Sequence, residues 1–155
     1  MDTTADTILE MIKIIDTAIS MERNAIMFFS SLAMKSDSAS KKKLYKDLTD
    51  NERSHMRRLI DKRNEYASHK SVDGIVGSID YNEKMTEIRD SFNPNDSMSD
   101  EEIIREAIKN EMKAYAFYQK KISYTKDPSA RKLLQDLAND EEEHARLLKE
   151  QLARM

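Results

Sequence analysis

Two stretches of the sequence share one pattern: residues 48–55 read LTDNERSH and residues 137–144 read LANDEEEH. Each contains Glu-x-x-His, formed by Glu52 and His55 and, 89 residues later, by Glu141 and His144. In a helix, a separation of three residues places both side chains on one face. A leucine four residues before each glutamate and another four residues after each histidine continue that face as an apolar stripe. The pattern predicts two helices that each bury a glutamate and a histidine.

A single glutamate interrupts an apolar stripe 30 residues before each of these pairs. Glu22 lies among isoleucines spaced three and four residues apart, and Glu111 occupies the matching position in the second half of the chain. Residues 21–29 align with residues 110–118 at the same offset of 89. The repeat predicts two similar helical hairpins that each supply two glutamates and one histidine.

Helical rise places these side chains at one depth. At about 1.5 Å per residue, Glu22 and Glu52 lie roughly 20 Å from the same end of their hairpin. Glu111 and Glu141 lie at similar distances from the turn of the second hairpin. Buried carboxylates repel one another and lose hydration, at a cost of several kcal/mol each, unless they bind protons or cations. Two divalent ions would balance four carboxylates, with the histidines as neutral ligands. The predicted metal ligands are Glu22, Glu52, His55, Glu111, Glu141 and His144.

Two other readings of the same residues stay open. A lone Glu-x-x-His is common on exposed helices, although two pairs at matched stripe positions are hard to obtain by chance. The six residues could also form a buried, protonated polar network without metal. Carboxylate and imidazole suit iron, but they do not exclude manganese or zinc.

Residues next to the candidate ligands carry weaker signals. Asp140 and Asn51 directly precede the two Glu-x-x-His glutamates and could hydrogen-bond to the ligand histidines. Tyr115 and Tyr118 lie on the inner face of their helix, where we expect core packing rather than a redox role.

The composition supports long helices and excludes several classes of protein. The 155 residues contain two glycines, two prolines and no cysteine, so thiolate chemistry and cysteine-held metal clusters are excluded. The formal net charge is −3, which gives no basic field for nucleic acid. No apolar run reaches membrane-spanning length, and no secretory signal opens the sequence, so we expect a cytoplasmic protein.

The chain is predicted to form one all-α domain, residues 1–155. Four helices are expected at about residues 4–35, 38–68, 99–126 and 128–154, and a crossover at 69–98 contains a short helix near 83–90. Ser99 with Glu102 resembles a capping box, and Asp127 precedes a proline at a first helical position. Two tight hairpins joined by one long crossover is the ferritin-like four-helix bundle arrangement.

Residues 22–29, 48–55 and 136–144 resemble the rubrerythrin branch of the ferritin-like superfamily, and the resemblance covers essentially the whole chain. It implies a non-haem di-iron site that reacts with peroxide or dioxygen, in a homodimer or larger assembly. Rubrerythrins proper also carry a rubredoxin-like domain that holds iron with four cysteines. Since this chain has no cysteine, electrons would come from an external donor, which could be of rubredoxin type.

A second departure from that family concerns the third helix. Rubrerythrins tend to have an additional glutamate one turn after the third-helix ligand, where this chain has Ala114. The family uses that position for the iron movement linked to peroxidase turnover, so the ligand set left here is closer to a symmetric bacterioferritin-type centre.

The function expected from the sequence is oxidation of bound Fe(II) by peroxide or dioxygen at a two-iron centre, of ferroxidase or peroxidase type. It would serve oxidative-stress defence or iron handling. One alternative is a metal-binding or structural bundle without turnover. Another is a di-iron oxygenase acting on an organic substrate, against which the bulky Phe28, Phe29, Phe117 and Tyr118 beside the centre argue.

Overall fold

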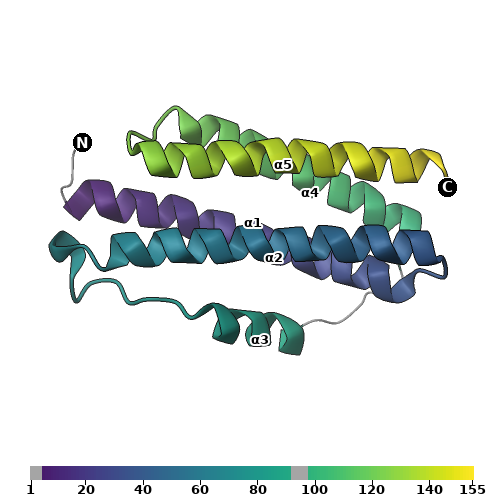
Figure 1. The fold of residues 1–155 in the computed structure, drawn as a ribbon, viewed down its shortest axis with the longest axis horizontal. Helices are drawn as coiled ribbons and strands as arrows, with labels where there is room; N and C mark the ends of the chain where they lie inside the picture. The colour runs from purple at the N-terminus through teal and green to yellow at the C-terminus, as the bar shows by residue number, and fades with distance from the viewer. Residues whose placement is uncertain (1–4, 92–97) are drawn as a thin grey trace.

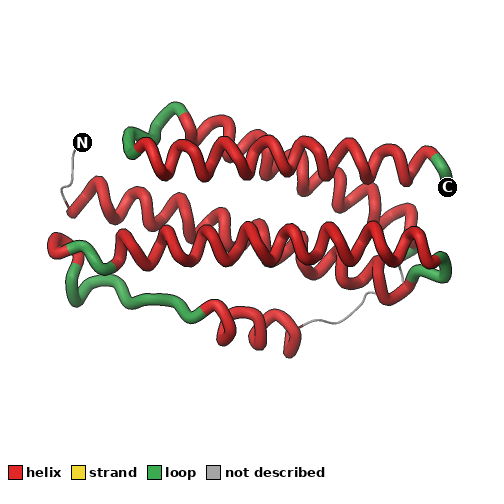
Figure 2. Tube along the Cα trace, in the orientation of Figure 1, coloured by secondary structure: helices red, strands yellow, loops and turns green. Residues whose placement is uncertain are grey.

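The computed structural model describes residues 5–91 and 98–155, which form five α-helices, one short 3-10 helix and no strand (Figures 1 and 2). The elements are α1 (Ala5–Lys35), α2 (Ala39–Ala67), η1 (Lys70–Val72), α3 (Tyr81–Ser91), α4 (Asp100–Ile122) and α5 (Pro128–Ala153). The all-helical prediction is confirmed. None of the helices in these two ranges is long and apolar enough to cross a lipid bilayer.

The four long helices pair as two hairpins. Helix α1 packs along α2, and α4 packs along α5, while α1 also contacts α4 and α2 contacts α5. The chain from η1 to α3 runs along the outside of α2, on the side away from α5 (Figure 1). Over its described residues, 68–91, the connection between the two hairpins therefore runs beside the helices.

Local signals in the sequence define the helix starts. Ser99 accepts a hydrogen bond from the Glu102 amide at 3.1 Å, and the Glu102 carboxylate accepts one from the Ser99 amide at 3.1 Å. This is the predicted capping box, which satisfies two amides that the helix leaves unbonded. Asp127 caps α5 by accepting from the Ser129 amide, and Pro128 occupies the first turn as expected.

Helix α4 ends at Ile122, four residues before the predicted end at residue 126. Tyr124 donates to the Lys121 carbonyl and Thr125 to the Ile122 carbonyl, so the backbone closes into tight turns. The cause lies further on, at Pro128, whose ring disfavours helical geometry at the preceding residue. Asp127 is accordingly extended, with ψ of 115°, and the residues before it are needed for the reversal.

The other predicted bounds of the long helices agree to within about one residue where they can be compared. The predicted start at residue 4 and residues 92–97 of the crossover lie outside the described residues. That residues 1–155 form a single domain stays a prediction.

The crossover is attached to α2 by hydrogen bonds and by apolar packing. The Asn64 amide group donates to the Ile79 carbonyl at 2.8 Å and accepts from the Ile79 amide at 2.9 Å. Arg63 donates to the Gly77 carbonyl at 2.7 Å. Helix α3, expected near residues 83–90, then covers α2 with Met85 and Ile88, which are 4% and 3% exposed.

Two apolar clusters fill the interior, and the candidate site lies between them. One contains Phe29, Tyr45, Leu48, Ile104 and Leu148, near the turn between α1 and α2. The other is larger and extends toward the opposite end, with Ile15, Leu59, Tyr118 and Leu134 among its members. Along α2, α4 and α5 the candidate ligands fall between members of the two clusters, and on α1 Glu22 lies just before the first member of the smaller cluster, Ala25. The prediction that they share one depth is therefore met.

Candidate metal centre

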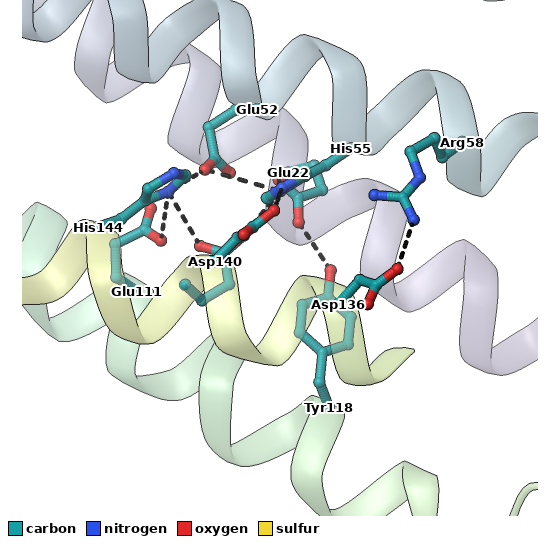
Figure 3. Close-up of polar contacts among 10 residues, drawn as sticks. Glu22, Glu52, His55, Arg58, Glu111, Tyr118, Asp136, Asp140 and His144 are labelled. Atoms are coloured by element: carbon teal, nitrogen blue, oxygen red, sulfur yellow. Dashed lines mark hydrogen bonds and ion pairs between the residues drawn. The ribbon is translucent and has the colours of Figure 1, made fainter. Parts of the chain in front are cut away.

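All six predicted ligand residues converge in the interior (Figure 3). Helix α1 supplies Glu22, α4 supplies Glu111, and α2 and α5 each supply a Glu-x-x-His pair. Their exposed fractions run from 0% at Glu52 to 5% at His144. An ionisable cluster this deep requires an explanation, since a buried charge without a partner is strongly unfavourable.

The side chains form two groups that share two members. The first group is Glu22, Glu52, His55 and Glu141, and the second is Glu52, Glu111, Glu141 and His144. Within each group, one potential ligand atom from every residue lies within 4.8 Å of the others. Because Glu52 and Glu141 belong to both groups, the arrangement is two adjacent four-residue sites bridged by two carboxylates.

Each histidine directs Nδ1 toward the shared carboxylates. His144 Nδ1 lies 2.5 Å from Glu52 Oε1, and His55 Nδ1 lies 3.0 Å from Glu141 Oε1. Each ring thus approaches the glutamate of the opposite Glu-x-x-His pair. The two rings stack, with centroids 5.7 Å apart and an interplanar angle of 14°. Nδ1 is therefore the nitrogen of each ring that is placed to bind a metal.

Asp140 holds one of these rings from outside. Its Oδ2 lies 2.9 Å from His55 Nε2, and its side chain is 45% exposed. A proton on Nε2 donated to this carboxylate leaves the Nδ1 lone pair for a metal, a common arrangement for histidine ligands. The prediction that Asp140 contacts a ligand histidine is confirmed, but the partner belongs to the other hairpin. Asn51, its counterpart, is exposed and makes no such contact among the described residues.

Tyr118 has a role that core packing alone does not cover. Its hydroxyl donates a 2.7 Å hydrogen bond to Glu22 Oε1, across from α4 to α1. The side chain is fully buried, and burial together with the neighbouring Glu22 raises the pKa of Tyr118 well above 10. The tyrosine therefore remains a proton donor that orients Glu22. Its position seven residues after Glu111, on the same face, was the only sequence signal for this contact.

The cluster retains protons when no cation balances it. Burial raises the pKa of Glu52 well above its usual value, and the negative charges of Glu22 and Glu141 raise it further. Burial would also raise the pKa of Glu22, but interactions with Glu52, His55 and Tyr118 lower it to about 2. Burial lowers the pKa of His55, yet contacts with Glu141 and Glu22 outweigh this and raise it to about 10. The raised pKa values of Glu52, Glu141 and His55 thus favour bound protons in place of positive charge.

Several buried ligand atoms make no well-directed hydrogen bond within the described residues, although His144 Nδ1 and Glu52 Oε1 form a close ion pair. They are Glu22 Oε2, both oxygens of Glu52, Glu111 Oε2, Glu141 Oε2 and His144 Nδ1. Buried polar atoms are nearly always satisfied in native proteins, and these point into one small volume. Oxygen and nitrogen donors in two bridged groups fit a pair of divalent cations better than they fit a closed hydrogen-bond network.

The fold and the site together define a class of protein: an all-helical chain with a buried group of carboxylate and histidine side chains of the kind that ligate metals. The family model for rubrerythrin matches residues 13–152. The chain belongs to the rubrerythrin family.

Solved structures support the same fold at low sequence identity. The bacterioferritin-related protein of Bacteroides fragilis, described as a dodecameric thioferritin, superposes with a TM-score of 0.72 at 20% identity. The alignment covers 95% of this chain and 86% of that one. A hypothetical protein from Pyrococcus furiosus gives a TM-score of 0.68 at 22% identity, covering 97% and 94% of the two chains.

A DUF305 fragment from Deinococcus radiodurans gives a TM-score of 0.70 at 12% identity, covering 94% of this chain and 96% of that one. At these identities the likeness extends to the fold alone. No curated protein is significantly similar to the chain in sequence.

Proposed function

We propose that the centre binds two iron ions and that the chain oxidises bound Fe(II) with peroxide or dioxygen, in oxidative-stress defence or iron handling. The observation that carries this proposal is the pair of four-residue groups that share Glu52 and Glu141. Four carboxylates balance two divalent charges and leave the histidines neutral. The proposed architecture is a ferritin-like four-helix bundle, in which such centres are built from facing helices.

Each ligand has a proposed place in the centre. Glu52 and Glu141 would each be a ligand to both ions, since each belongs to both groups. Glu22 and His55 complete one position, and Glu111 and His144 complete the other. Two bound iron ions would supply two electrons for reduction of peroxide or dioxygen. The same donor atoms accept manganese or zinc, so the identity of the metal is part of the proposal.

The protein's own contribution is to orient the ligands and to exclude bulk water. Tyr118 fixes one oxygen of Glu22, and Asp140 fixes the His55 ring. Outer hydrogen bonds of this kind set ligand direction and raise ligand basicity. Because every candidate ligand is at most 5% exposed, the reaction would occur in a low-dielectric interior.

Ala114 favours ferroxidase-like oxidation over rapid peroxidase cycling. It is buried, 6% exposed, and lies one turn after Glu111 on α4. The second group accordingly takes only Glu111 as a carboxylate from this helix. An iron ion at that position has no alternative carboxylate on α4 to which it could move. We expect one fast oxidation of the di-ferrous protein, followed by slow turnover.

Anaerobic loading with Fe(II), followed by stopped-flow mixing with peroxide, tests the proposal. We expect about two ions per chain and rapid oxidation in a single turnover, then slow steady-state consumption even with a rubredoxin-type reductant. Ala114→Glu should speed multiple turnover, with circular dichroism as a check because a buried acid costs stability. Bound iron that peroxide and dioxygen leave reduced would refute the oxidation proposal and favour a metal-binding bundle without turnover. Fast cycling by the unmodified protein would instead restore the peroxidase assignment.

The homodimer, the external electron donor and the cytoplasmic location stay predictions. They rest on the family resemblance and the sequence, and size-exclusion chromatography with light scattering tests the first of them.

A further inference from the structure

A second site lies on the far side of α2 from the metal centre, in the angle between α2 and α3. The cavity there has a volume of about 580 Å³. It is lined by Arg53, Arg57, Tyr81, Asn82, Met85 and Thr86. Two of these side chains are permanently cationic, and none is acidic. A volume of this size falls in the range of small-molecule sites, which is roughly 300–1,000 Å³.

The Arg57 side chain packs against an aromatic ring and keeps its positive charge unpaired among the described residues. Its guanidinium carbon lies 3.8 Å from the centroid of the Tyr81 ring. This cation–π contact occupies one face of the guanidinium and leaves its N–H edge free to donate. Among the residues that the structure describes, no carboxylate forms an ion pair with Arg57, whereas the adjacent Arg58 pairs with Asp136 at 3.1 Å.

Arg53 supplies a second, incompletely satisfied guanidinium. One of its terminal nitrogens donates to Asp50 at 3.2 Å, a contact within the same helix between exposed atoms. Its Nε is buried and has no hydrogen-bond partner among the described residues. Arg53 and Arg57 are four residues apart on α2, so their side chains lie on one helix face. The donors open to an acceptor are the guanidinium edge of Arg57 and the terminal N–H groups of Arg53 that Asp50 does not use.

The opposite wall adds groups that would orient a ligand. Asn82 contributes an amide that can donate, whereas Met85 is 4% exposed and offers little apolar surface. Thr86 already donates its hydroxyl proton to the Asn82 carbonyl at 3.0 Å. Planar guanidinium groups match the oxygens of carboxylates and phosphates through paired hydrogen bonds. The volume exceeds what a lone inorganic ion requires and leaves room for a short carbon skeleton beside the oxyanion.

We propose that the cavity between α2 and α3 binds a small organic anion, whose carboxylate or phosphate oxygens are recognised by Arg53 and Arg57. The site is separate from the candidate metal centre, because Arg53 and Arg57 face α3 and the other four lining residues belong to α3. It does not depend on the iron chemistry proposed above.

Calorimetric titration of the metal-loaded protein with succinate and with glycerol 3-phosphate, at matched ionic strength, tests the proposal. These probes present the two oxyanions on small carbon skeletons. We expect one equivalent of at least one probe to bind, and the tighter probe identifies the preferred oxyanion. Arg57→Gln and Arg53→Gln should each weaken binding by roughly tenfold or more, the factor expected for a charge-assisted hydrogen bond.

Arg58→Gln is the matched control, because it removes the same charge from the neighbouring position on another face. It should change the affinity by less than about twofold, as expected for a distant exposed charge. Arg57→Lys keeps the charge but loses the paired donors, so intermediate binding supports guanidinium recognition and guards against a folding defect. Absence of binding to both probes, or equal weakening by Arg58→Gln and Arg57→Gln, would overturn the proposal.

Discussion

The two halves of the candidate metal centre have matching candidate ligands, but outer hydrogen bonds to those ligands differ between the halves. Glu22 with His55 and Glu111 with His144 occupy equivalent positions in the 89-residue repeat. Tyr118 donates to Glu22, but the residue in the matching position is Phe29, which has no hydroxyl and lies edge-on to the His144 ring. Asp140 bonds to His55, while its counterpart Asn51 is exposed.

The difference teaches that a repeated hairpin can keep its ligands symmetric while the residues around them diverge. Outer hydrogen bonds reduce the freedom of a ligand before the metal arrives and therefore favour binding. We expect the half that contains Glu22 and His55 to fill first and to release its ion last.

The largest effect is expected from Glu141→Ala, which breaks both halves together because Glu141 belongs to both groups. Metal affinity should fall by more than about 100-fold, beyond the range typical of changes outside the ligands. Elemental analysis after dialysis should show far fewer than about two ions per chain. Glu142→Ala is the control, since Glu142 is exposed and outside both groups, and equal losses in the two variants would refute the ligand assignment.

Removing the metal should lower the melting temperature near neutral pH, by an amount that depends on His55. The pKa of His55 is raised to about 10 in the metal-free fold, so its protonation stabilises that fold below pH 6.5. This stabilisation is lost as the pH rises from 6.5 toward 10. The pKa of Glu22 is lowered to about 2, so its contribution is present above pH 4.5 and is lost as the pH falls toward 2.

The gap between metal-loaded and metal-free melting temperatures should therefore widen from pH 6.5 upward. It should close in acid as ligand protonation expels the ions. Calorimetric melting at a series of pH values measures both trends. A gap that stays constant across pH 5–9 would show that His55 holds no extra proton in the metal-free fold.

Asp140→Ala should weaken only the half that contains His55, by roughly 10- to 100-fold. The ring would lose the acceptor that orients Nε2, whereas His144 would be unaffected. Stepwise titration with cobalt(II), followed by its visible spectrum, separates the two binding events. Asn51→Ala, at the matching position of the repeat, is the control and should leave both binding steps unchanged. If both steps shift equally in the Asp140 variant, the contact supports overall folding rather than one metal position.

The smallest effect is expected from exchanging the residues at the Tyr118 and Phe29 positions. Tyr118→Phe removes one hydrogen bond to Glu22 and should weaken the tighter step by roughly tenfold. Phe29→Tyr should strengthen the weaker step if its hydroxyl reaches Glu111, although a fully buried ring leaves little room. The same cobalt titration measures both. If the affinity of the tighter binding step is unchanged in Tyr118→Phe, the tyrosine does not contribute to the difference between the two halves.

The helices, their caps and the six candidate ligands could be predicted from the sequence because each signal belongs to one helix. Period, rise per residue and capping chemistry place Glu22, Glu52 and Glu141 on inner faces at one depth before any partner is known. The early end of α4 was the exception among the long helices. There the reversal required by Pro128, six residues after the last residue of α4, overrode a pattern that continued to residue 126.

Only the tertiary structure decided which side chains meet across helices. Asp140 reaches His55 rather than the histidine of its own helix, and Tyr118 reaches Glu22 from α4. The pairing of Arg57 with Tyr81 beside a cavity is of the same kind. Such contacts depend on the rotation and offset of neighbouring helices, which are set by the packing of whole faces and not by the spacing along any single helix.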